Sequence, residues 1–449
     1  MSMAHRFLPK VTALLLAGCT TGGHASADPA ITSPAHLSAD RPGSPLTAPD
    51  DWWSGFRSAE LSELIGRARS EGFDVAASEA RVRRALAGTR IAGAALLPDL
   101  NANVAAEHSD GDPAFSIGLA TRYELDLWGR NHASRRGALA MLDAAEHDRN
   151  AVALIVETET AAAWAATVAA TERRAIAAHN LHAARRILGL VESRQRAGMA
   201  NPLELGQQRA LVASLEQRLA QIERERAFSR ATLASLLGRV PQGFDVATTT
   251  LTGVGLPSFT PELPSAVLLR RPDIAAAERR LAAADADVAL ARAAMWPQIT
   301  LRAGGLFESG RLPRLFDNPI YSLAFALTAP IFAGGRLAGE RDYAVARREE
   351  LWADYHGAIV AAFAEVEQAL SHIDTLERET DAQTEALRQA EIAARLAESR
   401  YQAGAETLLV MLDAQRILYA AQEDALTLRQ ARIRAAIILY RSVGGRLPT

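Results

Sequence analysis

Two segments of the chain alternate apolar and polar side chains with a period of two, which predicts strands with one apolar and one polar face. The first segment runs from Phe115 to Leu127, and the second from Tyr321 to Thr328. Each follows a partner segment of less regular alternation, 100–107 or 299–307. The pattern therefore predicts two β-hairpins. Their apolar positions are Phe115, Ile117, Leu119, Tyr123, Leu125 and Leu127 in the first, and Tyr321, Leu323, Phe325 and Leu327 in the second.

The face opposite these apolar positions carries small and polar residues. An apolar outer face with a polar inner face is typical of transmembrane β-barrels, but an ordinary antiparallel sheet with one buried face alternates in the same way. Four strands cannot close a barrel, because about eight is the smallest number that leaves a filled interior. A barrel would therefore be shared, and three protomers would supply twelve strands. The small and polar positions are Ser116, Gly118, Ala120, Arg122, Glu124 and Asp126, and Ser322, Ala324, Ala326 and Thr328.

Two long segments without proline follow the predicted hairpins. No proline occurs between Pro113 and Pro202, or between Pro330 and Pro448. Since proline costs about 3 kcal/mol in a helix interior, long helices are permitted there. The Ala-rich patterns at 130–197 and 336–403 predict helices of about 100 Å, which are typical of coiled coils or tubes. Shorter helices are expected afterwards, so that each long helix becomes one arm of a helical hairpin.

The chain contains an internal duplication, which predicts that one structural unit occurs twice. Ser193-Arg194-x-x-Ala197-Gly198 returns 206 residues later as Ser399-Arg400-x-x-Ala403-Gly404. Leu97-Pro98 returns as Trp296-Pro297, only 199 residues later. The difference places a longer loop in the second β-hairpin.

The N-terminus resembles the leader of a bacterial lipoprotein. A short basic region is followed by apolar residues 11–16, and Leu16-Ala17-Gly18-Cys19 is typical of a lipoprotein cleavage site. Cys19 is the only cysteine, so lipid attachment is its natural use and an intrachain disulfide is excluded. The residue after Cys19 is Thr20, and in this respect the chain resembles lipoproteins that are sorted to the outer membrane. We therefore expect a lipid anchor, such as palmitate, at Cys19.

These signals divide the chain into five parts. Within the two repeats we expect β-hairpins at 99–128 and 298–331 and helical hairpins at 130–238 and 336–443. The parts are a signal peptide (1–18), a flexible tether (19–50), a first repeat (51–239), a linker (240–265) and a second repeat (266–445).

The formal net charge of −3 argues against nucleic acid as a partner.

Several motifs along nearly the whole mature chain resemble the TolC/OprM-type family of outer-membrane efflux proteins, in its lipoprotein (NodT-like) branch. The resemblance implies a mainly α-helical fold with membrane β-structure: a trimeric 12-stranded barrel continuous with a long periplasmic α-helical barrel. The motifs are Trp52-Trp53-x-x-Phe56, Arg270-Arg271-Pro272-Asp273, Pro297-Gln298-Ile299, Phe332-Ala333-Gly334-Gly335-Arg336, Ser399-Arg400-Tyr401-x-x-Gly404 and Leu412-Asp413-Ala414-Gln415-Arg416.

The same resemblance implies a function, which is the passive exit duct of a tripartite pump for small molecules, as in multidrug resistance. Its expected partners are two further copies of the chain, a periplasmic adaptor protein, a proton-driven inner-membrane transporter and the lipid bilayer. Two alternatives remain: the outer-membrane component of a type I protein secretion system, and a lipid-anchored periplasmic coiled-coil scaffold. We find no catalytic motif, so we expect no enzyme, no cofactor and no metal site.

The resemblance also places adaptor docking and channel closure at the turns of the two helical hairpins. For docking or turn geometry we single out Arg196, Gly198, Gln402 and Gly404, although each glycine is also explained as a helix stop. Three copies of Glu406 would form a carboxylate ring at a periplasmic gate, whereas a solvated glutamate near a helix start is the simpler explanation. Asp413 and Arg416 belong to a resembling motif but could serve interhelical salt bridges instead.

Overall fold

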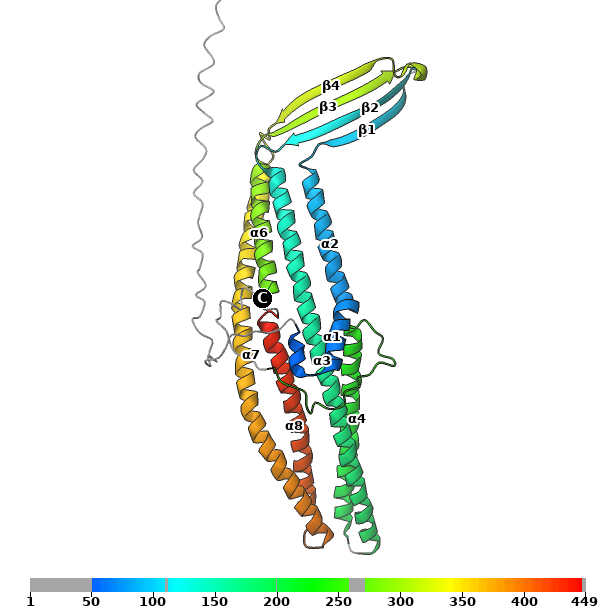
Figure 1. Ribbon diagram of the computed structural model, residues 1–449, viewed down its shortest axis with the longest axis vertical. Coiled ribbons are helices and arrows are strands. Elements are labelled where there is room, and N and C mark those ends of the chain that lie inside the picture. Colours follow the sequence, from blue (N-terminus) through cyan, green and yellow to red (C-terminus); the bar gives the residue numbers. More distant parts are fainter. Residues whose placement is uncertain (1–50, 110–111, 199, 258–270, 446–449) are drawn as a thin grey trace, which may run out of the picture. The chain divides into compact units, whose positions relative to one another are not determined.

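The computed structural model describes residues 51–109, 112–198, 200–257 and 271–445, all within one compact unit, Ala35–Thr449. Cys19, the signal peptide and the tether lie outside these residues. The elements in chain order are η1 (Trp52–Phe56), α1 (Ala59–Glu71), α2 (Phe73–Ala94), β1 (Asp99–Ser109), β2 (Asp112–Leu125), α3 (Arg130–Arg196), α4 (Pro202–Leu236), α6 (Pro272–Ala293), β3 (Gln298–Ser309), η2 (Leu312–Arg314), β4 (Pro319–Thr328), α7 (Arg336–Gln402) and α8 (Leu408–Ser442) (Figure 1).

The same series of elements occurs twice along the chain. Helices α2 and α6 have 22 residues each, α3 and α7 have 67 each, and α4 and α8 have 35 each. Nine residues separate β3 from β4, against two between β1 and β2, which accounts for the seven-residue change in the repeat spacing. The duplicated unit is therefore a helix, a β-hairpin and a long helical hairpin. The residue boundaries proposed for the repeats and linker stay a prediction.

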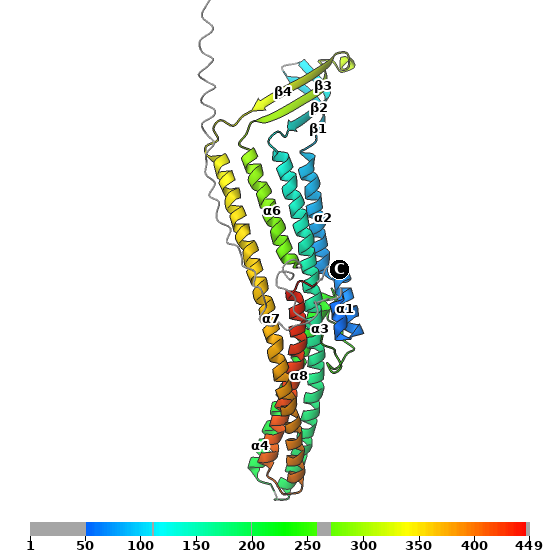
Figure 2. The same cartoon turned by 60° about the vertical axis from the view of Figure 1, so that its left-hand side comes forward.

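The long helices form a single layer in which neighbours lie side by side. In the half next to the strands, α3 packs against α2 and α6, and α6 packs against α7; in the other half α3 packs against α4 and α8. Both views show this row of helices (Figures 1 and 2). Domains normally bury apolar surface between two or more layers. A single layer leaves much of both faces accessible, except where η1 and α1 pack on α3.

One stretch of α3 has the length and composition of a membrane-spanning helix. Within the described residues, α3 alone contains an 18-residue window with the length and hydropathy of a membrane span, and 56% of that window is buried inside the protein. Trp164 lies in the main hydrophobic core with Trp52, Phe56 and Tyr440. The apolar character of α3 is thus explained by the core of this helical layer.

Two carboxylates hold the irregular segment after α4 against the helices. Glu60 on α1 accepts hydrogen bonds from the indole N–H of Trp164 (3.0 Å) and the backbone N–H of Thr248 (3.1 Å). Glu172 on α3 accepts one from the N–H of Leu251 (2.8 Å). Burial alone would raise the pKa of the Glu60 carboxyl, but the hydrogen bonds that it accepts hold that pKa below its ordinary value. These contacts fasten the first part of the predicted linker to α1 and α3.

Candidate functional site

The four strands form one antiparallel sheet in the order β1-β2-β3-β4, and its two faces differ in polarity as the sequence predicts. The register places Ile117 beside Val104 and Phe307, and Phe307 beside Pro319, so most of the apolar side chains of the four strands share one face. This face is uncovered: Val104 is 75% exposed and Leu323 77%. An apolar area of this extent on one sheet face marks a surface that another apolar phase covers.

The sheet has two open edges. No strand in the described part of the chain pairs with the outer edge of β1 or of β4, and every residue of β4 is exposed. Soluble proteins protect long apolar edge strands because free backbone N–H and C=O groups would recruit another strand. In a hydrocarbon phase an open edge is not tolerated at all. The edges of β1 and β4 therefore require strands from other copies.

Two tryptophans mark the end of the sheet that adjoins the helices. Trp128 and Trp296 stack with their ring centroids 5.2 Å apart. The indole N–H of Trp128 donates a hydrogen bond to the Pro297 carbonyl at 2.6 Å. Aromatic rings with one polar atom are typical of the interface between the bilayer and water. The pair thus sits where strands that span a membrane would emerge from it.

At the other end of α3 and α7, the turns of the helical hairpins have the geometry that their glycines predict. Gly198 has φ +73° and Gly404 has φ +74°, in the left-handed region that glycine enters without strain. A Cβ at either position would meet nothing within 4 Å. Glycine is therefore favoured at these turns by its left-handed backbone conformation and not by a lack of room for a side chain. Arg196 and Gln402 are exposed and bond to side chains of their own helices, Ser193 and Glu398.

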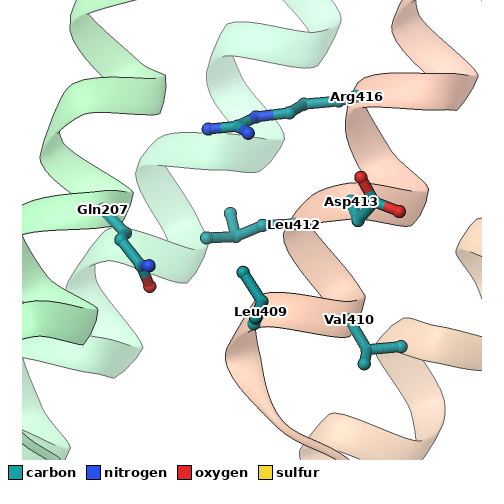
Figure 3. Close-up of a pocket in the computed structure, with 6 residues that line it drawn as sticks. All are labelled: Gln207, Leu409, Val410, Leu412, Asp413 and Arg416. Carbon is teal, nitrogen blue, oxygen red and sulfur yellow. The ribbon is translucent and has the colours of Figure 1, made fainter.

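A groove between the two hairpins lies near these turns. It has a volume of about 420 Å³ and is lined by residues of α4 and α8 (Figure 3). Arg416 and Leu412 extend from α8 toward the first hairpin, and Gln207 extends from α4 toward them. Two residues that the sequence singled out, Asp413 and Arg416, thus line one groove. The lining residues are Gln207, Leu409, Val410, Leu412, Asp413 and Arg416.

Glu406 does not line this groove. Its Oε1 accepts the N–H of Thr407 at 3.1 Å, and its Oε2 lies 3.7 Å from the guanidinium of Arg400. Both contacts engage Glu406 within its own turn. Sequence reasoning did not single out Gln207, Leu409 or Val410 among the lining residues. For Gln207 the duplication contains a signal, because Gln207 lies 206 residues before Asp413, at the equivalent place of the first repeat.

Comparison with known proteins shows the class to which this architecture belongs. The family model described as outer membrane efflux protein matches residues 64–239 and 263–445. The chain is 42% identical to the pyoverdine export outer membrane protein OpmQ of Pseudomonas aeruginosa, over 99% of this chain and 97% of that protein. It is 31% identical to the cation efflux system protein CusC of Escherichia coli K12, over 98% and 99% of the two chains. The crystal structure of the outer membrane protein VceC of Vibrio cholerae superimposes with a TM-score of 0.81 at 28% identity, over 89% and 99% of the two chains.

The chain belongs to the outer membrane efflux protein family. Proteins of this family are outer-membrane ducts of tripartite efflux pumps and are not enzymes. The resemblance seen in the motifs, the fold class, the efflux function and the expectation that the protein is not an enzyme are thereby confirmed. A periplasmic coiled-coil scaffold is not compatible with this membership. The roles of individual site residues and the lipid anchor stay predictions.

Proposed function

We propose that three copies of this chain join their four-stranded sheets into one 12-stranded barrel in the bacterial outer membrane, with the helices continuing the channel into the periplasm. The observation that carries this proposal is the sheet itself, which has an uncovered apolar face and two unpaired edges. Lipid covers the face, and the edges of β1 and β4 pair between copies. Closure of the sheet removes every edge from the hydrocarbon.

We further propose that the acylated Cys19 anchors the mature N-terminus to the same membrane. The leader motif supports this proposal. Each buried methylene contributes about 0.8 kcal/mol to membrane attachment, and stable anchoring requires more than one signal. In this protein the barrel supplies the second signal.

The partners that we propose are a periplasmic adaptor protein, which docks at the turns that carry Arg196, Gly198, Gln402 and Gly404, and a proton-driven inner-membrane transporter. As cargo we propose a small exported molecule of the pyoverdine kind. Two relatives that are 42% and 41% identical are named for pyoverdine export, whereas relatives named for toluene or cation efflux are 31% identical. Membership of an efflux family favours small molecules over the secreted proteins of a type I system.

The lipidated, full-length protein should behave as a trimer when it is purified in detergent. Light scattering should give three times the mass of one chain, because the strand edges are satisfied only in the closed barrel. Mass spectrometry should detect acyl groups on Cys19, and a Cys19→Ala variant should lose that added mass while it remains trimeric. A monomeric wild-type protein would contradict the barrel. An unmodified Cys19 in an otherwise trimeric protein would contradict only the anchor.

We also propose that Asp413 and Arg416 contribute to a periplasmic gate, with Glu406 in a lesser role. Asp413 is exposed and lines the groove, whereas the contacts of Glu406 with Thr407 and Arg400 reduce its effect on ions in the channel. Asp413→Asn should therefore lower the preference of the pore for cations by several-fold, and Glu406→Ala should lower it less, since a ring of carboxylates attracts cations.

Reversal potentials across planar bilayers under a KCl gradient measure this preference. Glu63→Gln is the matched control, because Glu63 is an exposed carboxylate on α1 that pairs with Arg67 of the same helix, remote from the turns. A larger effect of Glu406→Ala than of Asp413→Asn would reverse the assignment. An unchanged preference in both variants would remove both carboxylates from the gate.

A further inference from the structure

Two arginines face each other directly on the polar face of the sheet. Arg122 of β2 and Arg302 of β3 are register partners, so their Cβ atoms belong to a directly opposed cross-strand pair. Like charges in this position destabilise a sheet. Both residues are exposed. An arrangement of this kind has an electrostatic cost and contributes no packing, so it calls for a role outside the stability of the sheet.

The described residues around this pair neutralise it only in part. Asp99 of β1 is the next register position in the same row, but its Oδ1 accepts the backbone N–H of Arg122 and its Oδ2 accepts the side-chain amide of Asn101. Glu124, two residues along β2, pairs with Arg130 of α3 at 3.5 Å. Neither Arg122 nor Arg302 has an ion pair within 4 Å among the described side chains. The row thus keeps a net positive charge.

Apart from Asp99 and Glu124, the acidic side chain of β3 on this face lies at a different level. Glu308 pairs in register with Ser116, six residues from Arg122 along β2, which corresponds to about 20 Å of strand. On the edge strand β4, the positions next to the arginine pair, Ala324 and Ser322, are neutral. The two arginines are therefore the basic side chains of this face within the described strands, with Asp99 and Glu124 beside them and Glu308 toward the loops.

We propose that Arg122 and Arg302 of three copies form a ring of six guanidinium groups inside the barrel, and that this ring attracts anionic cargo. The inference rests on the proposed trimeric barrel, in which the polar face lines the channel. Rings of charged side chains between low-dielectric walls focus the field and raise the local concentration of ions of opposite sign. Guanidinium groups also bind carboxylates and similar oxyanions through two parallel hydrogen bonds. The substrate class is a small molecule with several negative charges.

Citrate, a small polyvalent anion, tests the ring in planar bilayers that contain the purified full-length protein. Citrate should block the wild-type current, and the inhibition constant should rise about 10-fold or more in the variant Arg122→Gln/Arg302→Gln, within the range of electrostatic focusing. The ratio of chloride to potassium permeability should fall in the same variant. An increase in KCl from 0.1 to 1 M should weaken the block, because the Debye length shortens from about 10 to about 3 Å.

Three controls distinguish charge from shape. Arg122→Lys/Arg302→Lys keeps the charges and should retain most of the block. Arg67→Gln/Arg239→Gln removes two positive charges that pair with Glu63 and Glu71 in the helical part and should change nothing. Spermidine is a trivalent cation. It should block pores of the wild type no more strongly than it blocks pores of the double glutamine variant.

The possible failures point to different claims. Pores whose citrate block and ion selectivity are unchanged by the double glutamine substitution would overturn the ring and leave the duct intact. An equal loss of block by citrate and by spermidine would also overturn it, since the effect would then be steric. A wild-type protein that forms no pores would overturn the proposed barrel itself. Because the glutamine variant relieves like-charge repulsion, its trimer should be at least as resistant to heat as the wild type.

Discussion

Replacement of Leu323 by arginine is expected to remove nearly all of the assembled protein from the outer membrane. Leu323 lies midway along β4 on the apolar face of the sheet and is 77% exposed in the protomer. An arginine on the lipid face of a barrel costs about 2–4 kcal/mol near the middle of the bilayer. Three symmetry-related copies would multiply this penalty. The measurement is the amount of heat-resistant trimer in isolated outer membranes, which should fall at least about 10-fold.

The adjacent residue supplies the matched control. Ser322 lies on the polar face of β4, opposite Gly304, so Ser322→Arg introduces the same side chain into the aqueous channel. This variant should assemble at close to the wild-type level. Equal loss of trimer in both variants would contradict the assignment of the two faces. Equal tolerance would show that lipid does not cover the apolar face.

Replacement of Arg271 by methionine should cause the largest loss of stability in the helical part. The Arg271 side chain is only 9% exposed and bonds to three groups: Asp273 (2.7 Å), Glu365 on α7 (2.6 Å) and the Ser442 carbonyl of α8 (3.2 Å). One guanidinium thus connects the start of α6 with α7 and the end of α8. Hydrogen bonds to charged groups contribute about 1.5–3 kcal/mol, and loss of one partner of a buried ion pair costs more. Because both carboxylates are about half exposed, we expect a total loss of about 2–4 kcal/mol.

The loss of helix on heating, followed by circular dichroism in detergent, measures this effect. Arg280→Met is the control on α6, because Arg280 is 38% exposed and, among the described residues, pairs with Asp148 alone. It should cost less than about 1 kcal/mol. Arg271→Lys should be intermediate, since an ammonium group lacks the planar fork that reaches all three partners. A variant Arg271→Met as stable as Arg280→Met would refute the importance of this connection.

The effect of Arg271→Met should also depend on pH. Burial alone would raise the pKa of Asp273, but the hydrogen bonds and positive charge of Arg271 hold that pKa below its ordinary value of 3.8. A carboxyl with a depressed pKa in the folded state stabilises the protein above its unfolded pKa, and this contribution is lost as the pH falls through the folded value. The difference between wild type and variant should therefore be full at neutral pH and shrink below about pH 4.

The sequence predicted those parts of the molecule that depend on local periodicity. The alternation around Leu323 and Ser322 assigned the two faces of β4, and the proline gaps indicated α3 and α7. The duplication located even the difference in loop length. In each case the relevant residues are neighbours along the chain, so the period of the pattern is sufficient to predict the element.

Other parts could not be predicted because they arise from contacts between residues far apart in the chain. Glu60 holds Thr248 across 188 positions, and no pattern in either segment indicates this pairing. Sequence reasoning assigned the carboxylate ring to Glu406, and it connected Asp413 with a motif or with interhelical salt bridges. The neighbours of the two carboxylates distinguish them. Glu406 contacts Arg400 and Thr407 of its own turn, whereas Asp413 lines the groove with Gln207 of the first hairpin.

The two helical hairpins of one protomer share a backbone plan but differ in chemistry near their turns. Asp413 of the second hairpin stands where the first has Gln207, and Arg416 stands where the first has Ala210. A trimer would therefore present six turns of two alternating kinds around its mouth. A ring-shaped partner of six identical subunits would have to bind in two different modes, or act as three dimers. The stoichiometry of the pump is thus tied to a gene duplication within a single chain.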